Sequence, residues 1–88
     1  MKTTILKDAD ATLNGPRAAD YGDAVKNHQR IADLWTVILG HKVEAYQVAL
    51  CMDAVKTARL IHTPEHYDSW LDKIGYCTIG SQCMEAEK

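Results

Sequence analysis

The sequence lacks the features that mark several common classes of protein. Its three cysteines, Cys51, Cys77 and Cys83, form no CxxC pair and no zinc-like spacing, so we expect reduced thiols in an intracellular protein. Lys and Arg form no cluster of five or more, and the net charge is −2. This charge argues against binding to DNA or RNA duplexes, because such binding needs a basic surface to neutralise phosphates.

Targeting and catalytic motifs are also missing. No uninterrupted apolar run approaches the roughly 18 residues of a membrane span. Lys7, Asp8 and Asp10 interrupt the first thirteen residues, so these cannot be the apolar part of a signal peptide. No P-loop, GxGxxG or GxSxG motif occurs. We therefore expect a cytoplasmic protein that does not bind membranes, and its reaction, if it has one, is not given by a motif.

The composition is that of a folded domain. Of the 88 residues, 47% are hydrophobic and 25% are charged, without any low-complexity run. We expect a single all-α domain over residues 1–88. A core of this size is marginal on its own, so self-association is the expected source of further stability.

The hydrophobic pattern predicts about four helices and almost no strand. The first covers about Thr4–Asn14 and ends at Gly15 and Pro16. The second begins at Asp23, a suitable N-cap, and runs to Leu39 before Gly40.

The other two predicted helices form an antiparallel pair. The third runs from about Val43 to His62. The fourth begins with Thr63 as N-cap and Pro64 in the first helical position, and it continues to about Gly80. The short connection makes the two helices antiparallel neighbours.

Charged residues mark the interface of this pair. The apolar residues of the third helix surround its axis, which predicts a central helix with Cys51 on a buried face. Lys56 and Arg59 fall inside this apolar arc and therefore require an anion. Asp68 and Asp72, four apart on the fourth helix, are the candidate partners. The four charges indicate either a structural ion-pair network or a site for a phosphate and its metal.

Three further features have two interpretations each. Gly75, beside Asp72, predicts the close approach of a backbone or a ligand. The stretch "RAADYG" (residues 17–22) lies before a helix, where Arg17 could help to bind an anion; the alternative is a loop fixed by Asp20 and by packing of Tyr21. Surface or capping roles are favoured over zinc binding for the four histidines, which are His28, His41, His62 and His66, and Cys77 is expected on a buried face.

The stretches "RAADYGDAVKNHQRIADLW", "VALCMDAVKTARL" and "HYDSWLDKIGY" resemble a family of short phage and prophage proteins of unknown function. The family pattern reads RxxDYG, NxxRIAxLW, KxARL and DSWxDxxGY, and the resemblance covers nearly the whole chain. It implies a protein of the host cytoplasm.

That family is distantly similar to the MazG-like all-α nucleotide pyrophosphohydrolases, which are bundles of about four helices that form oligomers. In those enzymes acidic residues of two helices hold Mg²⁺, and the metal holds the nucleotide. The similarity implies Mg²⁺ at Asp68 and Asp72, where an ExxD pair would fall. The EExxE motif of the preceding helix is not matched, because Asp53, Lys56 and Arg59 stand in that stretch.

Two functions follow as hypotheses. The first is a nucleotide-handling protein that binds, or binds and sequesters, a phosphate-bearing ligand through Arg17, Tyr21, Lys56, Arg59 and Tyr76. Hydrolysis is less favoured than binding, because acids of the Mg²⁺ site are missing. The second is a small interaction module that acts through its oligomer or a host partner protein.

Overall fold

The computed structural model describes residues 4–14 and 23–87, and its described residues form four α-helices without a strand. The all-α prediction is therefore confirmed. The helices are α1 (Thr4–Asn14), α3 (Ala24–Leu39), α4 (Ala45–His62) and α5 (Tyr67–Ala86).

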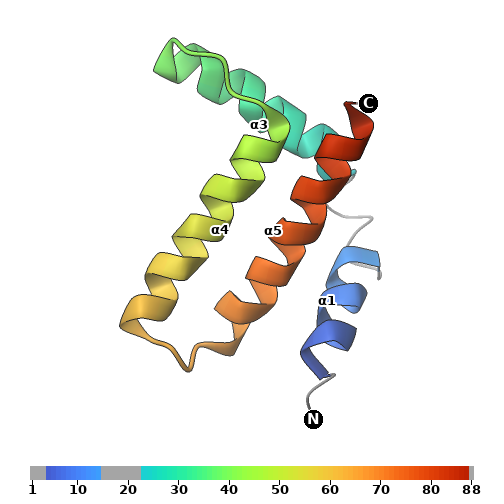
Figure 1. Cartoon of the computed structure of the whole chain (residues 1–88), viewed down its shortest axis with the longest axis vertical. Helices are drawn as coiled ribbons and strands as arrows, with labels where there is room; N and C mark the ends of the chain where they lie inside the picture. The colour runs from blue at the N-terminus through green and yellow to red at the C-terminus, as the bar shows by residue number, and fades with distance from the viewer. Residues whose placement is uncertain (1–3, 15–22, 88) are drawn as a thin grey trace.

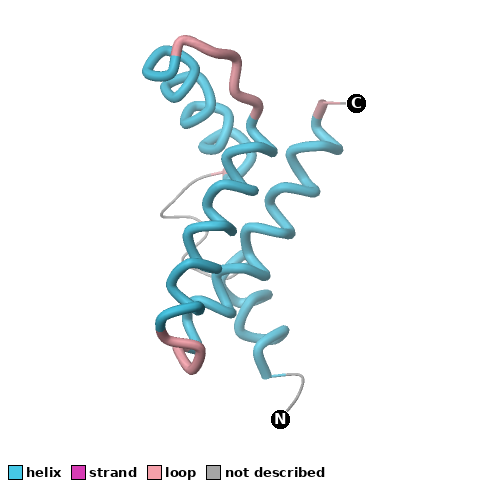
Figure 2. The backbone as a smooth tube through the Cα atoms, turned by 60° about the vertical axis from the view of Figure 1, so that its left-hand side comes forward, coloured by secondary structure: helices cyan, strands magenta, loops and turns pink. Residues whose placement is uncertain are grey.

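The helices α4 and α5 form an antiparallel pair that carries the other two. The helix α1 lies along the opposite side of α5 from α4, and α3 crosses the end of the pair where α4 begins and α5 ends (Figure 1). The C-terminal half of α3 projects beyond the pair, as Figure 2 also shows. This arrangement leaves much of α3 and one face of α4 without a neighbour in the described chain.

Local capping fixes the ends of α3. The Asp23 carboxylate accepts hydrogen bonds from the backbone N–H groups of Val25 and Lys26, at 2.8 and 3.1 Å. Gly40 ends the helix in the left-handed conformation, with φ 65°, which a glycine adopts without steric cost. The sequence predicted both caps. The same Asp23 carboxylate occupies the N-terminal amides, which an anion would otherwise use.

Two sets of local hydrogen bonds fix the connection from α3 to α4. The Thr36 hydroxyl accepts a hydrogen bond from the Val43 backbone N–H at 2.9 Å. Glu44 and Gln47 form a capping box at the start of α4. The helix therefore starts at Ala45, two residues later than the sequence indicated.

The start of α5 differs from the prediction. Thr63 is not the N-cap of α5, because its backbone N–H still bonds to the carbonyl of Arg59 at the end of α4. The N-cap is His66, whose ring accepts from the Ser69 backbone N–H. Trp70 donates its indole N–H to the Pro64 carbonyl at 2.8 Å, which fixes the turn between the two helices.

Small residues let α4 and α5 approach closely. The buried side chains of α4 are Ala45, Val48, Ala49 and Leu60. A Cβ atom placed on Gly80 would lie 3.3 Å from the Cβ of Ala49, closer than ordinary van der Waals contact, so a glycine suits this close approach. Gly75 is different, because a Cβ atom there would meet nothing within 4 Å. The predicted approach of another backbone at Gly75 is therefore wrong among the described residues.

The core is small, and α4 is not central. Half of the buried hydrophobic residues are alanines, and the main cluster joins Ala32, Val43 and Val48. Leu50 and Ile61 of α4 are 62% and 81% exposed, so α4 is covered on one side only. Its apolar face was expected to be buried all round, and the single chain does not supply enough helices to do so.

The cysteine prediction is also corrected. Cys51 and Cys77 are exposed, on the faces of α4 and α5 that no other described helix covers. Cys83 is buried, and this burial raises the pKa of its thiol above the usual value. All three thiols are free.

The two helical glycines predict opposite responses to alanine. Gly75→Ala is expected to raise the free energy of unfolding by up to about 1 kcal/mol, because alanine has the higher helix propensity and the added methyl group meets open space. Gly80→Ala is expected to give no gain or a loss, because the Ala49 methyl group cannot rotate away. Urea denaturation of both variants checks this, and equal stabilisation by both would contradict the close approach at Gly80.

Candidate functional site

The predicted contact between charges of α4 and α5 exists at one pair of residues. The Lys56 ammonium lies 2.9 Å from an Asp72 carboxylate oxygen, and the side chains are 17% and 38% exposed. The pair is therefore half-buried at the edge of the helix interface. The sequence placed these residues together because both fall on the facing sides of an antiparallel pair.

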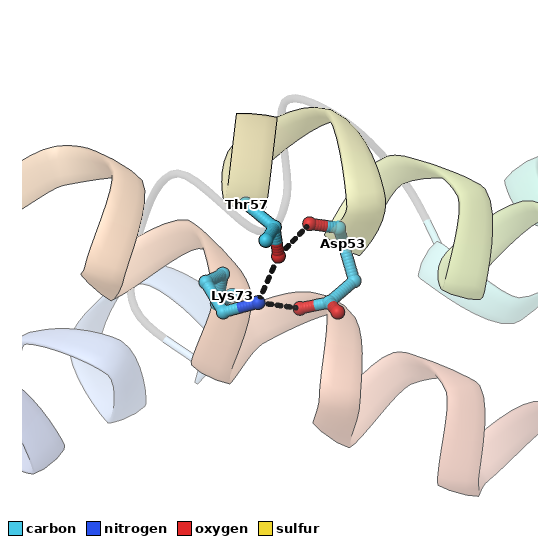
Figure 3. A network of polar contacts seen from close by, with 3 residues as sticks. All are labelled: Asp53, Thr57 and Lys73. Carbon is cyan, nitrogen blue, oxygen red and sulfur yellow. Dashed lines mark hydrogen bonds and ion pairs between the residues drawn. The ribbon is translucent and has the colours of Figure 1, made fainter. Parts of the chain in front are cut away.

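A second ion pair crosses the same interface and was not predicted. The Lys73 ammonium lies 2.9 Å from an Asp53 carboxylate oxygen and 2.6 Å from the Thr57 hydroxyl (Figure 3). The Thr57 hydroxyl in turn donates to the Asp53 backbone carbonyl at 3.1 Å. Each helix thus supplies one acid and one lysine to the pairing.

The other predicted charges lie elsewhere. Arg59 is exposed, and no described residue forms an ion pair with it, so its expected position inside the apolar interface is wrong. Asp68 is exposed in the first turn of α5. Arg17 and Tyr21 lie outside the described residues, and their proposed roles stay predictions.

A cavity of about 450 Å³ lies where α1, the start of α3 and the middle of α5 meet. This volume is within the range of about 300–1,000 Å³ that is usual for ligand pockets. The predicted residues Asp72 and Tyr76 are in its wall, together with Gly75. The remaining polar residues of the wall are Thr12, Asn14, Asp23, Asn27, His28 and Gln82. Among the described residues of the wall there is no Lys or Arg.

His28 is the residue of this wall that sequence reasoning placed wrongly. Its side chain is only 5% exposed, whereas a surface or capping role was favoured. Its Nδ1 lies 2.9 Å from the Ala24 backbone carbonyl, which can only accept, so Nδ1 carries the proton. In the neutral ring Nε2 is then an acceptor, and it is buried without a hydrogen-bond partner among the described residues. In the sequence, His28 falls at helical spacing among the apolar residues that form one stripe of α3, and this position was the signal of its burial.

The ring of Tyr76 and the helix α1 form further parts of the cavity wall. The rings of His28 and Tyr76 have centroids 6.2 Å apart and are inclined by 56°. The helix α1 forms one side of the cavity and packs mainly against α5. The Tyr67 hydroxyl of α5 donates a hydrogen bond to the Asp8 carboxylate of α1, which raises the pKa of Tyr67 above its usual value.

The described residues contain no group of three or more His, Cys, Asp and Glu that could hold a metal ion. Asp68 and Asp72 stay a predicted pair for Mg²⁺, which also takes oxygen ligands from substrate phosphates. Within the same part of the chain, no helix is both long and apolar enough to cross a membrane.

Together these features describe, for the described residues, a small all-α protein with a pair of ion-paired helices and a cavity beside them whose wall is mixed polar and apolar. The chain belongs to the family "Domain of unknown function (DUF6378)", whose model matches residues 4–84. It is 40% identical over 77 residues to the Gene 55 protein of Mycobacterium phage L5, and 34% identical over 76 residues to the Gene 55 protein of Mycobacterium phage D29.

These relatives are longer than the chain. Each match covers 86% of this chain but only 49% and 50% of the two phage proteins, so the chain spans about half of their length. The prediction that the chain belongs to a phage protein family of unknown function is therefore confirmed. No solved structure matches the chain.

The half-buried position of the Lys56–Asp72 pair predicts a weak coupling. A double-mutant cycle of Lys56→Met and Asp72→Asn is expected to give a coupling free energy of at most about 1 kcal/mol, because solvent screens the pair. The matched cycle of Arg59→Met with Asp72→Asn is expected to be additive. A coupling of about 3 kcal/mol or more for Lys56 and Asp72 would show that the pair is fully buried.

Proposed function

We propose that this protein binds a nucleotide or another phosphate-bearing small molecule, and that it binds the ligand and does not hydrolyse it. The observation that carries the proposal is the cavity between α1, α3 and α5, with Asp72 in its wall and Lys56 2.9 Å behind that carboxylate. Lys56 is not among the described residues of the wall, so a ligand in this cavity would meet it by displacing Asp72, and lysine is a common phosphate-binding residue. Tyr76 would contact the organic part of the ligand.

The ion pairs that the acidic residues form with lysines support binding of the ligand over its hydrolysis. Asp53 and Asp72, one on each helix, both have a lysine at 2.9 Å. A carboxylate that neutralises a lysine holds Mg²⁺ less well, because the ammonium repels the metal ion. Hydrolysis through Mg²⁺ would require the ligand or the metal to displace these lysines, whereas phosphate binding requires only that phosphate replace Asp72 beside Lys56.

The architecture, oligomeric state and location belong to the same proposal. We propose a MazG-like bundle that is completed by association of two or more copies, in the cytoplasm of the phage host. The exposed apolar residues of α3 and α4 support the association, because a small core of which half is alanine stabilises a chain of this length only weakly.

A thermal-shift panel of nucleoside mono- and triphosphates tests the binding. Wild-type protein is expected to melt at a higher temperature with its ligand, since a ligand at 100 times its dissociation constant adds about 2.7 kcal/mol to the stability of the folded state. The shift is expected to survive EDTA. Lys56→Ala is expected to remove it, and Arg59→Ala, one turn further along α4, to weaken it.

Lys73→Ala is the matched control, because this variant removes the lysine of the other ion pair, which lies outside the cavity wall. It should melt earlier but keep the ligand-induced shift. Asp72→Asn should keep or increase the shift, because it frees Lys56. Mg²⁺-dependent release of pyrophosphate that is lost in Asp72→Asn would instead establish a hydrolase with Asp72 as a metal ligand. An unchanged melting temperature across the whole panel would contradict the proposal.

An interaction module is the second candidate, and the exposed apolar surface favours it. Leu50, Ala54, Ala58 and Ile61 are exposed along one stripe of α4. On the projecting half of α3, Leu34, Val37, Ile38 and Leu39 are exposed as well. Monomers rarely expose so many large apolar side chains in so short a chain.

Light scattering tests the association. At micromolar concentrations the wild-type protein is expected to have a mass at least twice that of the 9.8 kDa chain. Leu50→Gln with Ile61→Gln is expected to lower the mass to that of one chain, because both side chains lie on the exposed stripe. Lys26→Gln on the exposed start of α3 is the control. A wild-type protein that scatters as one chain and still melts cooperatively would exclude the association.

A further inference from the structure

The cavity wall is unusual in what it offers to a ligand. Its described residues include Asp23 and Asp72, each with a carboxylate, and His28, whose Nε2 atom is buried, but no Lys or Arg. Among the described residues of the wall, a phosphate inside the cavity would face like charges without a cation. The phosphate-binding lysine of the proposed function, Lys56, stands behind Asp72 and not in the wall. The inside of the cavity therefore fits the uncharged end of a nucleotide.

The hydrogen bonding of His28 indicates which chemical group of the ligand would lie in the cavity. Because Nδ1 donates to the Ala24 carbonyl, Nε2 in the neutral ring presents a lone pair. A buried acceptor without a donor destabilises the fold, and such a group in a native protein calls for an explanation. A ligand with an N–H group would supply the missing donor.

The surroundings of His28 fit a flat heteroaromatic ring. Tyr76 lies beside His28 and offers an aromatic face, and Leu71 and Ile79 add apolar wall on the same helix. A nucleobase has both properties that this wall requires, an aromatic face for Tyr76 and N–H groups along its edge for an acceptor.

We infer that the cavity is a nucleobase site, in which His28 Nε2 accepts a hydrogen bond from an N–H group of the base while Tyr76 packs against its ring. The inference rests on the proposed function, and it assigns the base to the cavity and the phosphates to the Lys56 side of Asp72. His28 is thus a residue that determines specificity for the base. A small movement of the neighbouring side chains is needed, because Nε2 is shielded in the free protein.

Nucleosides test the inference without any phosphate. Adenosine, guanosine, cytidine and uridine are each added to the wild-type protein, and at least one is expected to raise the melting temperature. For that nucleoside, the N-methylated analogue that lacks the N–H donor is expected to bind at least tenfold more weakly. His28→Phe, which keeps a ring of similar size but has no acceptor, is expected to fold and to lose the nucleoside-induced shift.

Two controls separate a direct contact from a structural role. His28→Gln places an amide near the position of Nε2 and is expected to restore part of the shift, whereas His41→Phe, at an exposed histidine, should leave binding unchanged. In nitrogen-15 spectra of the histidine side chains, the free protein should show His28 protonated at Nδ1. The Nε2 resonance should then move when the nucleoside is added.

The outcomes distinguish this inference from the function on which it rests. If nucleotides raise the melting temperature but His28→Phe retains the full shift, or Nε2 does not respond, the base is not bound by His28 and the nucleotide-binding proposal stands. If the free protein carries the proton on Nε2, the inference is likewise wrong. If neither nucleosides nor nucleotides bind, the proposed function fails, and the base site fails with it.

Discussion

The antiparallel pairing of α4 and α5 is the contact on which the rest of this structure depends. Ala49 and Gly80 bring the two backbones close together, and the Asp53–Lys73 and Lys56–Asp72 pairs cross the same interface further along. Each half-exposed ion pair adds at most about 1 kcal/mol, so burial of small apolar side chains supplies most of the attraction. The charges add polar contacts at the exposed edge of the interface, where Lys56 and Asp72 and Lys73 and Asp53 lie 2.9 Å apart.

The helix ends that are set by residues close by in the sequence could be predicted from the sequence. Asp23 and Gly40 bound α3 through hydrogen bonds and backbone angles that are complete within a few residues. The start of α5 was misplaced because Thr63, a good N-cap by residue type, already serves as the C-cap of α4. Two helices compete for this residue in a four-residue connection, and residue preference alone does not decide which of them uses it.

Burial was less predictable, because it depends on which helices are available to cover a face. The angular position of Arg59 within the apolar arc of α4 was a sound observation, yet one side of that arc faces no described helix, so Arg59, Leu50 and Cys51 are exposed. Lys56 met its predicted partner because α5 covers that side. His28 was misjudged for the converse reason: a polar residue type suggested the surface, whereas its place in the stripe set its burial.

The cavity follows from the arrangement of helices around the α4–α5 pair and not from a motif. Its wall combines the last turn of α1 and the first turns of α3 with the middle of α5, which is distant from both in the sequence. Of these, α1 packs mainly against α5, with the Tyr67–Asp8 hydrogen bond among its contacts. A ligand that touches all three segments would hold α1 in place through its own binding free energy, since binding to the folded arrangement stabilises that arrangement. The packing of α1 against α5 would therefore respond to a ligand in this cavity, since α1 forms one side of it.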